Sequence, residues 1–300
     1  MPPPPADEQP DRPAADPGRQ SGALGRNLPL AIASGVALAA VFLATLWLSP
    51  WVFLGFVGIV LVSALLELDA VLRGTGLRPA TPVALAAGLV ALFGAYAHGP
   101  AAQSLALVLL LVGTLAWVLL APPPEERAPL ASGRAGGVAV DLGATCVMAL
   151  WVPFLASFLA LLLARPDGRW YVMAAIALTV SNDIGAFAFG SRFGRHKLAP
   201  SVSPGKSWEG FAGGLVTVAV LAGLITARLP GFDLPVALAF GLAAALGGTL
   251  GDLSESLVKR DLGVKDLGRI VPGHGGIMDR VDAIIFALPV THLTLVAFGL

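Results

Sequence analysis

The chain has 300 residues, of which 56% are hydrophobic and only 13% are charged. Soluble proteins carry roughly 25% charged residues, so this composition excludes a soluble globular protein and predicts an all-α, polytopic membrane protein. The formal net charge is zero, which by itself excludes no partner, because membrane proteins distribute charge by side of the bilayer. We expect the lipid bilayer as a partner, and no nucleic acid.

Residues 1–27 are rich in proline and polar side chains and lack the apolar core of a signal peptide. They are predicted to form a disordered cytoplasmic tail. Apolar stretches long enough to cross a membrane follow, and they predict about nine transmembrane helices. The stretches cover residues 28–48, 51–68, 80–97, 103–121, 137–164, 170–190, 210–228, 233–251 and 280–300. The fifth contains Pro153, so a kink or bend is expected within it.

The distribution of Lys and Arg predicts the orientation. With the N-terminus in the cytoplasm, sixteen of the 19 basic residues fall on the inside, and only Arg165, Arg169 and Arg228 fall outside. Cytoplasmic loops of membrane proteins carry an excess of Lys and Arg. We therefore expect a cytoplasmic N-terminus in a multi-pass protein of the cell (inner or plasma) membrane.

The chain divides into two predicted transmembrane regions. Residues 28–121 contain few polar side chains and are interpreted as an N-terminal scaffold. Residues 122–136 are rich in Pro and Gly and are predicted to form a cytoplasmic linker. Polar residues are more frequent within the spans of residues 137–300, which are predicted to form the catalytic region.

In the sixth predicted span, an acid interrupts an apolar helix. Asp183 lies seven residues before Gly190, or roughly 10 Å below the cytoplasmic end at 1.5 Å per residue. A carboxylate at that depth is costly unless it faces a cavity, a cation or a basic partner. Asp183 is therefore a candidate functional residue, and a structural ion pair with a neighbouring helix is the alternative.

A basic segment follows at residues 190–210. It carries Lys206 and Ser207 within a Pro-Gly-Lys-Ser sequence, but position 200 is proline where a Walker A motif requires glycine. The segment is predicted to be a stiff loop in which Lys206 and Ser207 contact a phosphate. The alternative is a loop whose positive charge only orients the protein in the membrane.

Residues 251–282 hold six of the 19 acids and five of the 19 bases. Residues 251–261 can be helical, and the face at i, i+3, i+4, i+7 and i+8 then carries Asp252, Glu255, Ser256, Lys259 and Arg260. A glycine-rich loop follows, as expected of a phosphate site. The loop leads to Asp279 and Asp282 at the start of the last span, where carboxylates complement the helix dipole and can hold a divalent cation. A merely solvated, charged connection is the alternative.

The spacing in this stretch resembles the signature of phosphatidate cytidylyltransferases. That signature runs Ser, two residues, Lys-Arg, four residues, Lys-Asp, and then a loop into Pro-x-His-Gly-Gly, two residues and Asp-Arg-x-Asp. The matching positions are Ser256, Lys259, Arg260, Lys265, Asp266, Gly268, Pro272, His274, Gly275, Gly276, Asp279, Arg280 and Asp282. The segments around Asp183 and Lys206 are also similar to the family, although Ile184 and Phe187 lack hydroxyl groups that the family often has.

The resemblance implies an enzyme that transfers CMP from CTP to phosphatidic acid, giving CDP-diacylglycerol and pyrophosphate, with its active site facing the cytoplasm. It also implies Mg²⁺ as cofactor, and it is compatible with a monovalent cation beside it and with a homodimer. The residues alone indicate only metal-dependent phosphoryl or nucleotidyl transfer to a lipid.

The expected roles divide the candidate residues into three sets. The metal ligands are expected to be Asp252 and Asp279. The catalytic set is Asp252, Asp279, Asp183, Lys259, Arg260 and His274. The substrate-binding set is Lys206, Ser207, Ser256, Lys265, Asp266, Gly275, Gly276, Arg280 and Asp282.

Two other functions are compatible with these acids and bases. A secondary transporter could use Asp183 and the acids of residues 251–282 for ion coupling, but such transporters commonly contain internal repeats, and here the polar residues lie in one half of the chain. A lipid kinase, or a cytidylyltransferase for another lipid phosphate, would need the same chemistry. Product analysis separates these enzymes.

Overall fold

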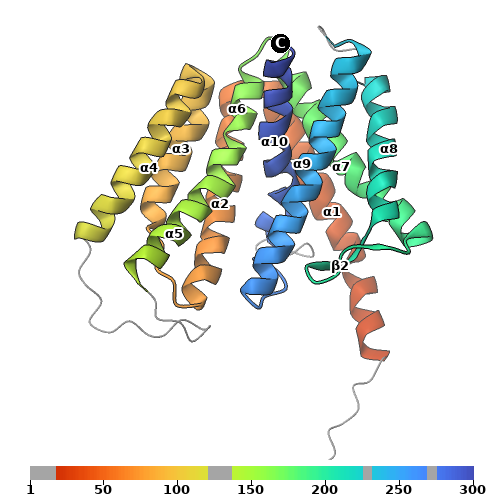
Figure 1. Ribbon diagram of the computed structural model, residues 1–300, viewed down its shortest axis with the longest axis horizontal. Helices are drawn as coiled ribbons and strands as arrows, with labels where there is room; N and C mark the ends of the chain where they lie inside the picture. The colour runs from red at the N-terminus through yellow and green to blue at the C-terminus, as the bar shows by residue number, and fades with distance from the viewer. Residues whose placement is uncertain (1–17, 121–136, 226–231, 269–275) are drawn as a thin grey trace, which may run out of the picture.

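The structure is a computed structural model that describes residues 18–120, 137–225, 232–268 and 276–300. Figure 1 shows a bundle of helices with one short β-hairpin at the lower end. The elements are α1 (Gly18–Leu48), α2 (Pro50–Gly74), α3 (Thr81–His98), α4 (Pro100–Leu120), α5 (Val138–Ala149), the π-helix η1 (Leu150–Phe154), α6 (Phe158–Leu163), α7 (Gly168–Phe193), β1 (Lys197–Ala199), β2 (Ser203–Ser207), α8 (Trp208–Ile225), α9 (Leu234–Asp261) and α10 (Met278–Ala297).

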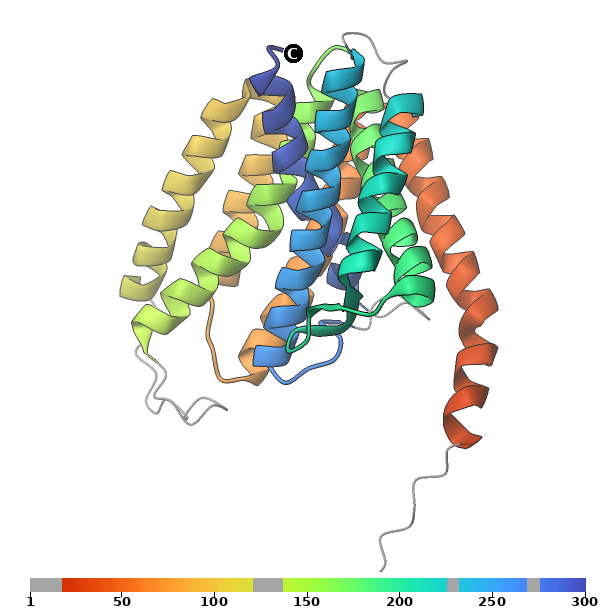
Figure 2. The same cartoon turned by 45° about the vertical axis from the view of Figure 1, so that its right-hand side comes forward.

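The helices run side by side along the height of the bundle (Figures 1 and 2). In the C-terminal half, α7 packs on α8, and α9 packs on α10 and α8. In the N-terminal half, α3 packs on α4, and α1 packs on α2. The turn between α2 and α3, the hairpin and the turn after α9 all lie at the lower end, which therefore collects segments from both halves.

The predicted fold class is confirmed. Within the described ranges, seven helical segments are long and apolar enough to cross a membrane, and Ala33–Leu48 and Trp208–Leu224 are shorter apolar helices. Together they correspond to the nine predicted stretches. On α4, the side chains of Val108, Leu111 and Val112 are more than half exposed, as expected for a face in contact with lipid.

Several helices extend beyond the predicted spans. Helix α1 begins at Gly18, inside the segment assigned to the tail, while residues 1–17 and the predicted linker, 122–136, lie outside the described residues. Helices α2 and α9 continue to Gly74 and Asp261. Their last turns carry basic side chains, Arg73 in α2 and Lys259 and Arg260 in α9, which interact favourably with the negative end of the helix dipole. Apolar length alone therefore underestimates them.

The bend predicted in the fifth span is confirmed. Between α5 and α6 the chain forms the π-helix η1, which contains Pro153. Proline lacks an N–H, and its ring clashes with the preceding turn, so an α-helix cannot continue undisturbed through it. Helix α3 accommodates the bend with Gly88, where an added Cβ would lie only 2.5 Å from the Pro153 Cβ.

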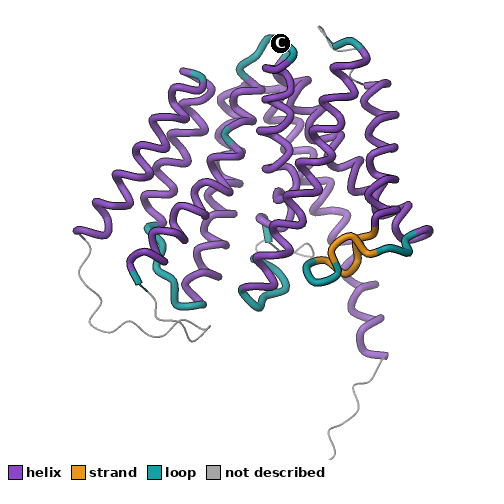
Figure 3. Tube along the Cα trace, in the orientation of Figure 1, coloured by secondary structure: helices purple, strands orange, loops and turns teal. Residues whose placement is uncertain are grey.

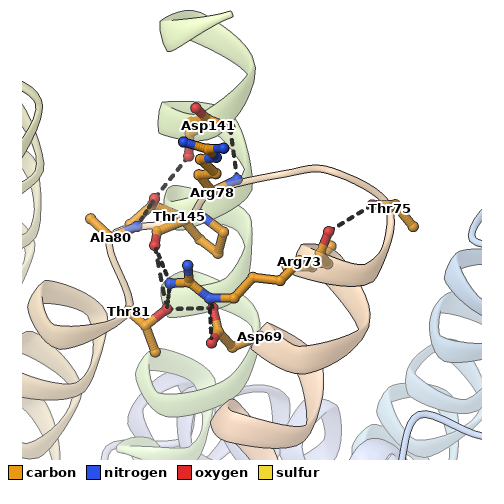
Figure 4. Close-up of polar contacts among 10 residues, drawn as sticks. Asp69, Arg73, Thr75, Arg78, Ala80, Thr81, Asp141 and Thr145 are labelled. Carbon is orange, nitrogen blue, oxygen red and sulfur yellow. Dashed lines mark hydrogen bonds and ion pairs between the residues drawn. The ribbon is translucent and has the colours of Figure 1, made fainter. Parts of the chain in front are cut away.

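The turn between α2 and α3 is fixed to α5 by hydrogen bonds (Figure 4). The backbone N–H of Arg78 donates to Asp141 Oδ1 at 2.9 Å, and the N–H of Ala80 donates to Thr145 Oγ1 at 2.9 Å. Asp141 and Thr145 are both buried. These bonds satisfy backbone groups that the turn leaves without helical partners, and they hold the lower end of α2 in a defined position.

Helices α9 and α10 approach each other closely through two glycines of α9. An added Cβ on Gly247 would lie 2.8 Å from the Ala287 Cα, and one on Gly251 would lie 2.5 Å from the Asp282 carbonyl oxygen. Small residues allow this backbone contact between membrane helices. The contact brings the acids at the end of α9 beside those at the start of α10.

We predict that Gly251→Ala destabilises the protein, because its methyl group would force α9 away from α10. Overpacking of this kind typically costs about 1–3 kcal/mol. Gly143→Ala on α5 is the matched control, since no atom lies within 4 Å of an added Cβ there. Thermal unfolding in detergent should show a melting temperature several degrees lower for the first variant only. Equal melting temperatures would contradict the proposed backbone contact.

Candidate functional site

Two adjoining pockets lie where α7, α9 and α10 meet the hairpin. The acid pocket, of about 280 Å³, is lined by Asp183, Asp252, Glu255, Ser256, Lys259, Asp266, Asp279, Arg280, Asp282 and Ala283. The hairpin pocket, of about 550 Å³, is lined by Asn182, Asp183, Ala186, Phe187, Gly190, Ser191, Leu198, Ser203, Gly205, Lys206, Ser207, Gly210, Phe211, Thr249 and Asp252. Asp183 and Asp252 line both, so they stand at the boundary between the pockets.

The acid pocket brings together most of the predicted site residues. These are Asp183, Asp252, Ser256, Lys259, Asp266, Asp279, Arg280 and Asp282. The predicted helical face of α9 supplies one wall. Glu255, which lies on that face but was not among the candidates, is only 3% exposed and belongs to the same wall.

Other candidates lie elsewhere. Arg260 and Lys265 are exposed and line neither pocket. Gly276 is buried two residues before α10 begins, and its N–H donates to Asp279 Oδ2 at 3.0 Å. His274 and Gly275 lie outside the described residues.

A lysine links the two helices that form the acid pocket. Lys259 Nζ lies 2.6 Å from Glu255 Oε2 on α9 and 2.6 Å from Asp279 Oδ1 on α10. The side chains of Glu255 and Asp279 are almost fully buried. The single ammonium neutralises one of the two carboxylate charges, and removing one member of a buried ion pair costs about 3–5 kcal/mol. Lys259 therefore stabilises the acid cluster.

Asp279 also holds the two ends of the glycine-rich loop together. Its Oδ1 accepts a hydrogen bond from the Leu267 N–H at 3.3 Å, and its Oδ2 accepts the bond from Gly276. Leu267 is buried. Because these donors precede and follow the loop, one carboxylate both closes the loop and faces the acid pocket.

The basic segment at residues 190–210 was predicted to be a loop, but it contains a β-hairpin, so the predicted absence of regular structure was wrong. Strands β1 and β2 pair antiparallel, with Ala199 opposite Ser203 (Figure 3). The hairpin is held at its base by Glu209, which pairs with His196 Nδ1 at 2.6 Å and accepts a hydrogen bond from the Arg195 N–H at 3.0 Å. These contacts connect the start of β1 to the first turn of α8.

Two contacts join the hairpin to α9. Lys206 Nζ lies 2.5 Å from Asp252 Oδ2, and Arg260 Nε donates to the Val202 carbonyl oxygen at 3.3 Å. The predicted phosphate-binding Lys206 thus neutralises a predicted metal ligand. Arg260 contacts the turn of the hairpin and lies outside the acid pocket.

Ser207 ends the hairpin in a tightly packed position. Its side chain is buried, and its Oγ accepts a hydrogen bond from the Gly210 N–H at 3.1 Å. A Cβ added to Gly190 would lie 3.2 Å from the Ser207 Oγ, and one added to Gly194 would lie 2.7 Å from it. The hydroxyl therefore fixes the start of α8 against the end of α7, and it also borders the hairpin pocket.

Asp183 faces the pockets, as expected for a carboxylate that must avoid lipid. Within the part of the chain that the structure describes, no salt bridge involves Asp183, so the alternative of a structural ion pair has no support there. The neighbouring Asn182 is buried, and its Nδ2 donates to Thr249 Oγ1 on α9 at 3.2 Å. This bond fixes the stretch of α7 that carries Asp183.

The N-terminal half contributes an acid that the sequence interpretation missed. Glu67 on α2 is 6% exposed, and its Oε2 accepts a hydrogen bond from the Met278 N–H at 3.1 Å. Residues 28–121 were interpreted as scaffold, so no function was assigned to this side chain. The available signal was the one used for Asp183, an acid within an apolar helix.

The residues of the acid pocket fit magnesium in the number and type of ligands. No group of three or more His, Cys, Asp or Glu side chains in the described residues is arranged to hold a metal ion. Magnesium needs fewer, because it is typically bound by one or two carboxylates together with water and substrate phosphates. Asp252 and Asp279 line the same pocket and supply such oxygens, and their role as ligands stays a prediction.

Comparisons with known proteins match nearly the whole chain to one family. The model of the cytidylyltransferase family matches residues 30–298. The chain is 37% identical over 283 residues to a phosphatidate cytidylyltransferase of Mycobacterium bovis, covering 93% of this chain and 92% of that protein. It is 38% identical over 268 residues to one of Mycobacterium leprae, covering 87% and 85%. One of Staphylococcus aureus is 43% identical over 134 residues, covering 44% and 51%. The chain belongs to the cytidylyltransferase family.

Proposed function

We propose that this membrane protein transfers CMP from CTP to phosphatidic acid, forming CDP-diacylglycerol and pyrophosphate. Family membership and the activity named for the relatives support this reaction. The structural observation that carries the proposal is the junction of the acid pocket with the hairpin pocket at Asp183 and Asp252. Two phosphate-bearing substrates must meet in this reaction, and the junction is where they would meet.

The reaction needs no nucleophile from the protein. A phosphate oxygen of the lipid attacks the α-phosphorus of CTP, and a new P–O bond forms there. The bond from the α-phosphorus to the oxygen that bridges to the β-phosphate breaks, and pyrophosphate leaves with that electron pair. The protein must position the two phosphates and neutralise their charge.

The acid pocket suits the triphosphate of CTP together with a divalent cation. Asp252 and Asp279 would hold Mg²⁺, which when bound would neutralise phosphate charge as a Lewis acid. Lys259 and Arg280 line the same pocket and can donate to phosphate oxygens. A monovalent cation beside the magnesium stays a prediction.

The lysine contacts suggest how the site changes when substrate arrives. Lys206 and Lys259 pair with Asp252 and Asp279, the two proposed metal ligands. A triphosphate brings negative charge that attracts both lysines, since charge-assisted bonds to phosphate are stronger than neutral ones. We infer that the lysines turn to the phosphates and leave the carboxylates to the cation that accompanies the nucleotide.

The hairpin pocket suits the lipid. Its lining combines Lys206 and Asp183 with the aromatic side chains of Phe187 and Phe211. Phe187 is 77% exposed on α7, so the pocket borders a surface that acyl chains can contact. A phosphate near Lys206 would lie beside Asp252, at the boundary with the acid pocket.

We further propose that the lower end of the bundle faces the cytoplasm. The hairpin and the turns after α2 and α9 lie at that end (Figure 1), and the sequence places sixteen of its 19 basic residues in the segments predicted to be inside. The positive-inside rule supports this orientation. It gives the site access to CTP, while a homodimer stays a prediction.

We predict that the purified full chain, with magnesium, CTP and phosphatidic acid in detergent, releases pyrophosphate and CDP-diacylglycerol in equal amounts. Replacing CTP by ATP should lower turnover by at least about tenfold, because differential binding of the base sets specificity. Product analysis by mass spectrometry checks both. Equal turnover with ATP and a phosphorylated lipid as product would replace the proposal with a lipid kinase.

We predict that Asp252→Asn and Asp279→Asn each lower turnover by at least about 100-fold, because each removes charge proposed to hold the cation. Asp261→Asn is the matched control: this acid also lies near the end of α9, but it is exposed and lines neither pocket. Its activity should stay within about threefold of the parent chain. A melting temperature close to that of the parent chain verifies that each variant is folded. Magnesium-dependent activity near the parent level in Asp252→Asn or Asp279→Asn would refute the ligand assignment.

A further inference from the structure

An acid of the N-terminal half reaches the loop of the candidate site. Glu67 lies on α2 among the buried apolar side chains of Ala64, Leu65 and Leu68. Its Oε2 accepts a hydrogen bond from the N–H of Met278, 211 residues later in the chain. Met278 is the first residue of α10. Glu67 therefore lies at the N-terminal end of the helix that carries Asp279.

The surroundings of Glu67 explain how its charge is tolerated. A carboxylate buried in a membrane helix is costly unless specific partners compensate it. The N-terminus of α10 offers free backbone N–H groups and the positive end of a helix dipole. Glu67 is thus held where its charge is favourable, at the point where the loop re-enters the bundle.

Two glycines of the signature make room for this carboxylate. An added Cβ on Gly268 would overlap the Glu67 carboxyl group, and one on Gly276 would lie 2.8 Å from Glu67 Oε2. At both positions a side chain would therefore collide with the Glu67 carboxyl group. Their backbones flank residues 269–275, so the Glu67 carboxylate lies between the two ends of the loop.

Asp279, in the first turn of α10, also contacts both ends of the loop. It accepts hydrogen bonds from the N–H groups of Leu267 and Gly276, while Glu67 accepts from Met278 and packs against Gly268. The two carboxylates together hold the segments that enter and leave the loop. A displacement of Glu67 would release one of these supports and change the position of Asp279.

We propose that Glu67 is a positioning residue that fixes the base of the glycine-rich loop and thereby orients Asp279 toward the acid pocket. The kinetic consequences of this role rest on the proposed function. The contact of Glu67 with Met278 and Gly268 rests on geometry alone. The positioning role gives a part in the reaction to α2, which was interpreted as scaffold.

The kinetic test uses Glu67→Ala, Glu67→Gln and the control Asp69→Asn. Asp69 lies on the same helix but pairs with Arg73 and Thr81 (Figure 4). Glu67→Ala should lower kcat/KM for CTP by about 10- to 100-fold and raise the magnesium concentration needed for half-maximal rate, as expected when a group that orients a metal ligand is lost. Glu67→Gln keeps an oxygen acceptor for Met278 and should restore most of the activity. Asp69→Asn should retain the parent magnesium requirement.

A stability test needs neither metal nor substrate. Gly268→Ala should lower the melting temperature, because its methyl group overlaps the Glu67 carboxyl group. In a Glu67→Ala background that space is free, so the same substitution should cost at most about half as many degrees, since contacting residues give non-additive effects. Gly74→Ala on α2 is the control: no atom lies within 4 Å of an added Cβ there, so its effect should be additive with Glu67→Ala.

The outcomes separate the two proposals. Additive melting temperatures for Gly268→Ala and Glu67→Ala would overturn the contact. A parent-like magnesium requirement in Glu67→Ala, or a Glu67→Gln variant as impaired as Glu67→Ala, would overturn the positioning role. Absence of cytidylyl transfer by the parent chain would instead refute the proposed function, and the melting temperatures would still decide whether Glu67 supports the loop.

Discussion

The ion bridge from Lys259 to Glu255 and Asp279 is the interaction on which the rest of the site depends. Carboxylates gathered at one end of a membrane bundle repel each other and are poorly solvated there. The Lys259 ammonium lies between one acid of α9 and one of α10 and neutralises one of their two charges. This lowers the repulsion between the two helices where their backbones approach at Gly251. With the helices in contact, Asp279 gathers both ends of the glycine-rich loop. The ion bridge, the contact between α9 and α10 and the hydrogen bonds at the two ends of the loop therefore depend on one another.

The same arrangement suggests why nucleotide and cation would bind together. Each proposed metal ligand is already paired with a lysine, Asp252 with Lys206 and Asp279 with Lys259. A cation alone must compete with these ammonium groups, whereas a nucleotide with its cation offers the lysines phosphate oxygens in exchange. Because Lys206 belongs to the hairpin, such an exchange would also alter how the hairpin is held to α9. The acid pocket and the hairpin pocket, which share Asp252, would thus be coupled through it.

The sequence was sufficient to predict the fold and most of the residues that line the acid pocket, but not most of those that line the hairpin pocket or the contacts between distant segments. Apolar length predicts the spans, and Pro153 predicts the bend in the fifth, because both are local properties. The periodic face of α9 predicts the wall formed by Asp252, Ser256 and Lys259 for the same reason. The hairpin was missed because its two short strands, Lys197–Ala199 and Ser203–Ser207, carry no alternating apolar pattern. Glu67 is an acid within an apolar helix, which was a usable signal, but it was missed because its half of the chain was interpreted as scaffold; its contact with Met278, 211 residues away, could not be predicted from the sequence. The reason for small residues at Gly268 and Gly276 appears only once α2 is placed beside α10.

The most direct test of this account is a Mn²⁺ titration of the purified full chain by electron paramagnetic resonance, with and without a non-hydrolysable CTP analogue. Mn²⁺ prefers the same oxygen ligands as Mg²⁺ and reports binding without turnover. We expect one Mn²⁺ per chain to bind at least about tenfold more tightly when the analogue is present, which is an ordinary size for coupling between two ligands. That tight binding should be lost in Asp252→Asn. Equal Mn²⁺ affinity with and without the analogue, or unchanged binding in Asp252→Asn, would contradict it.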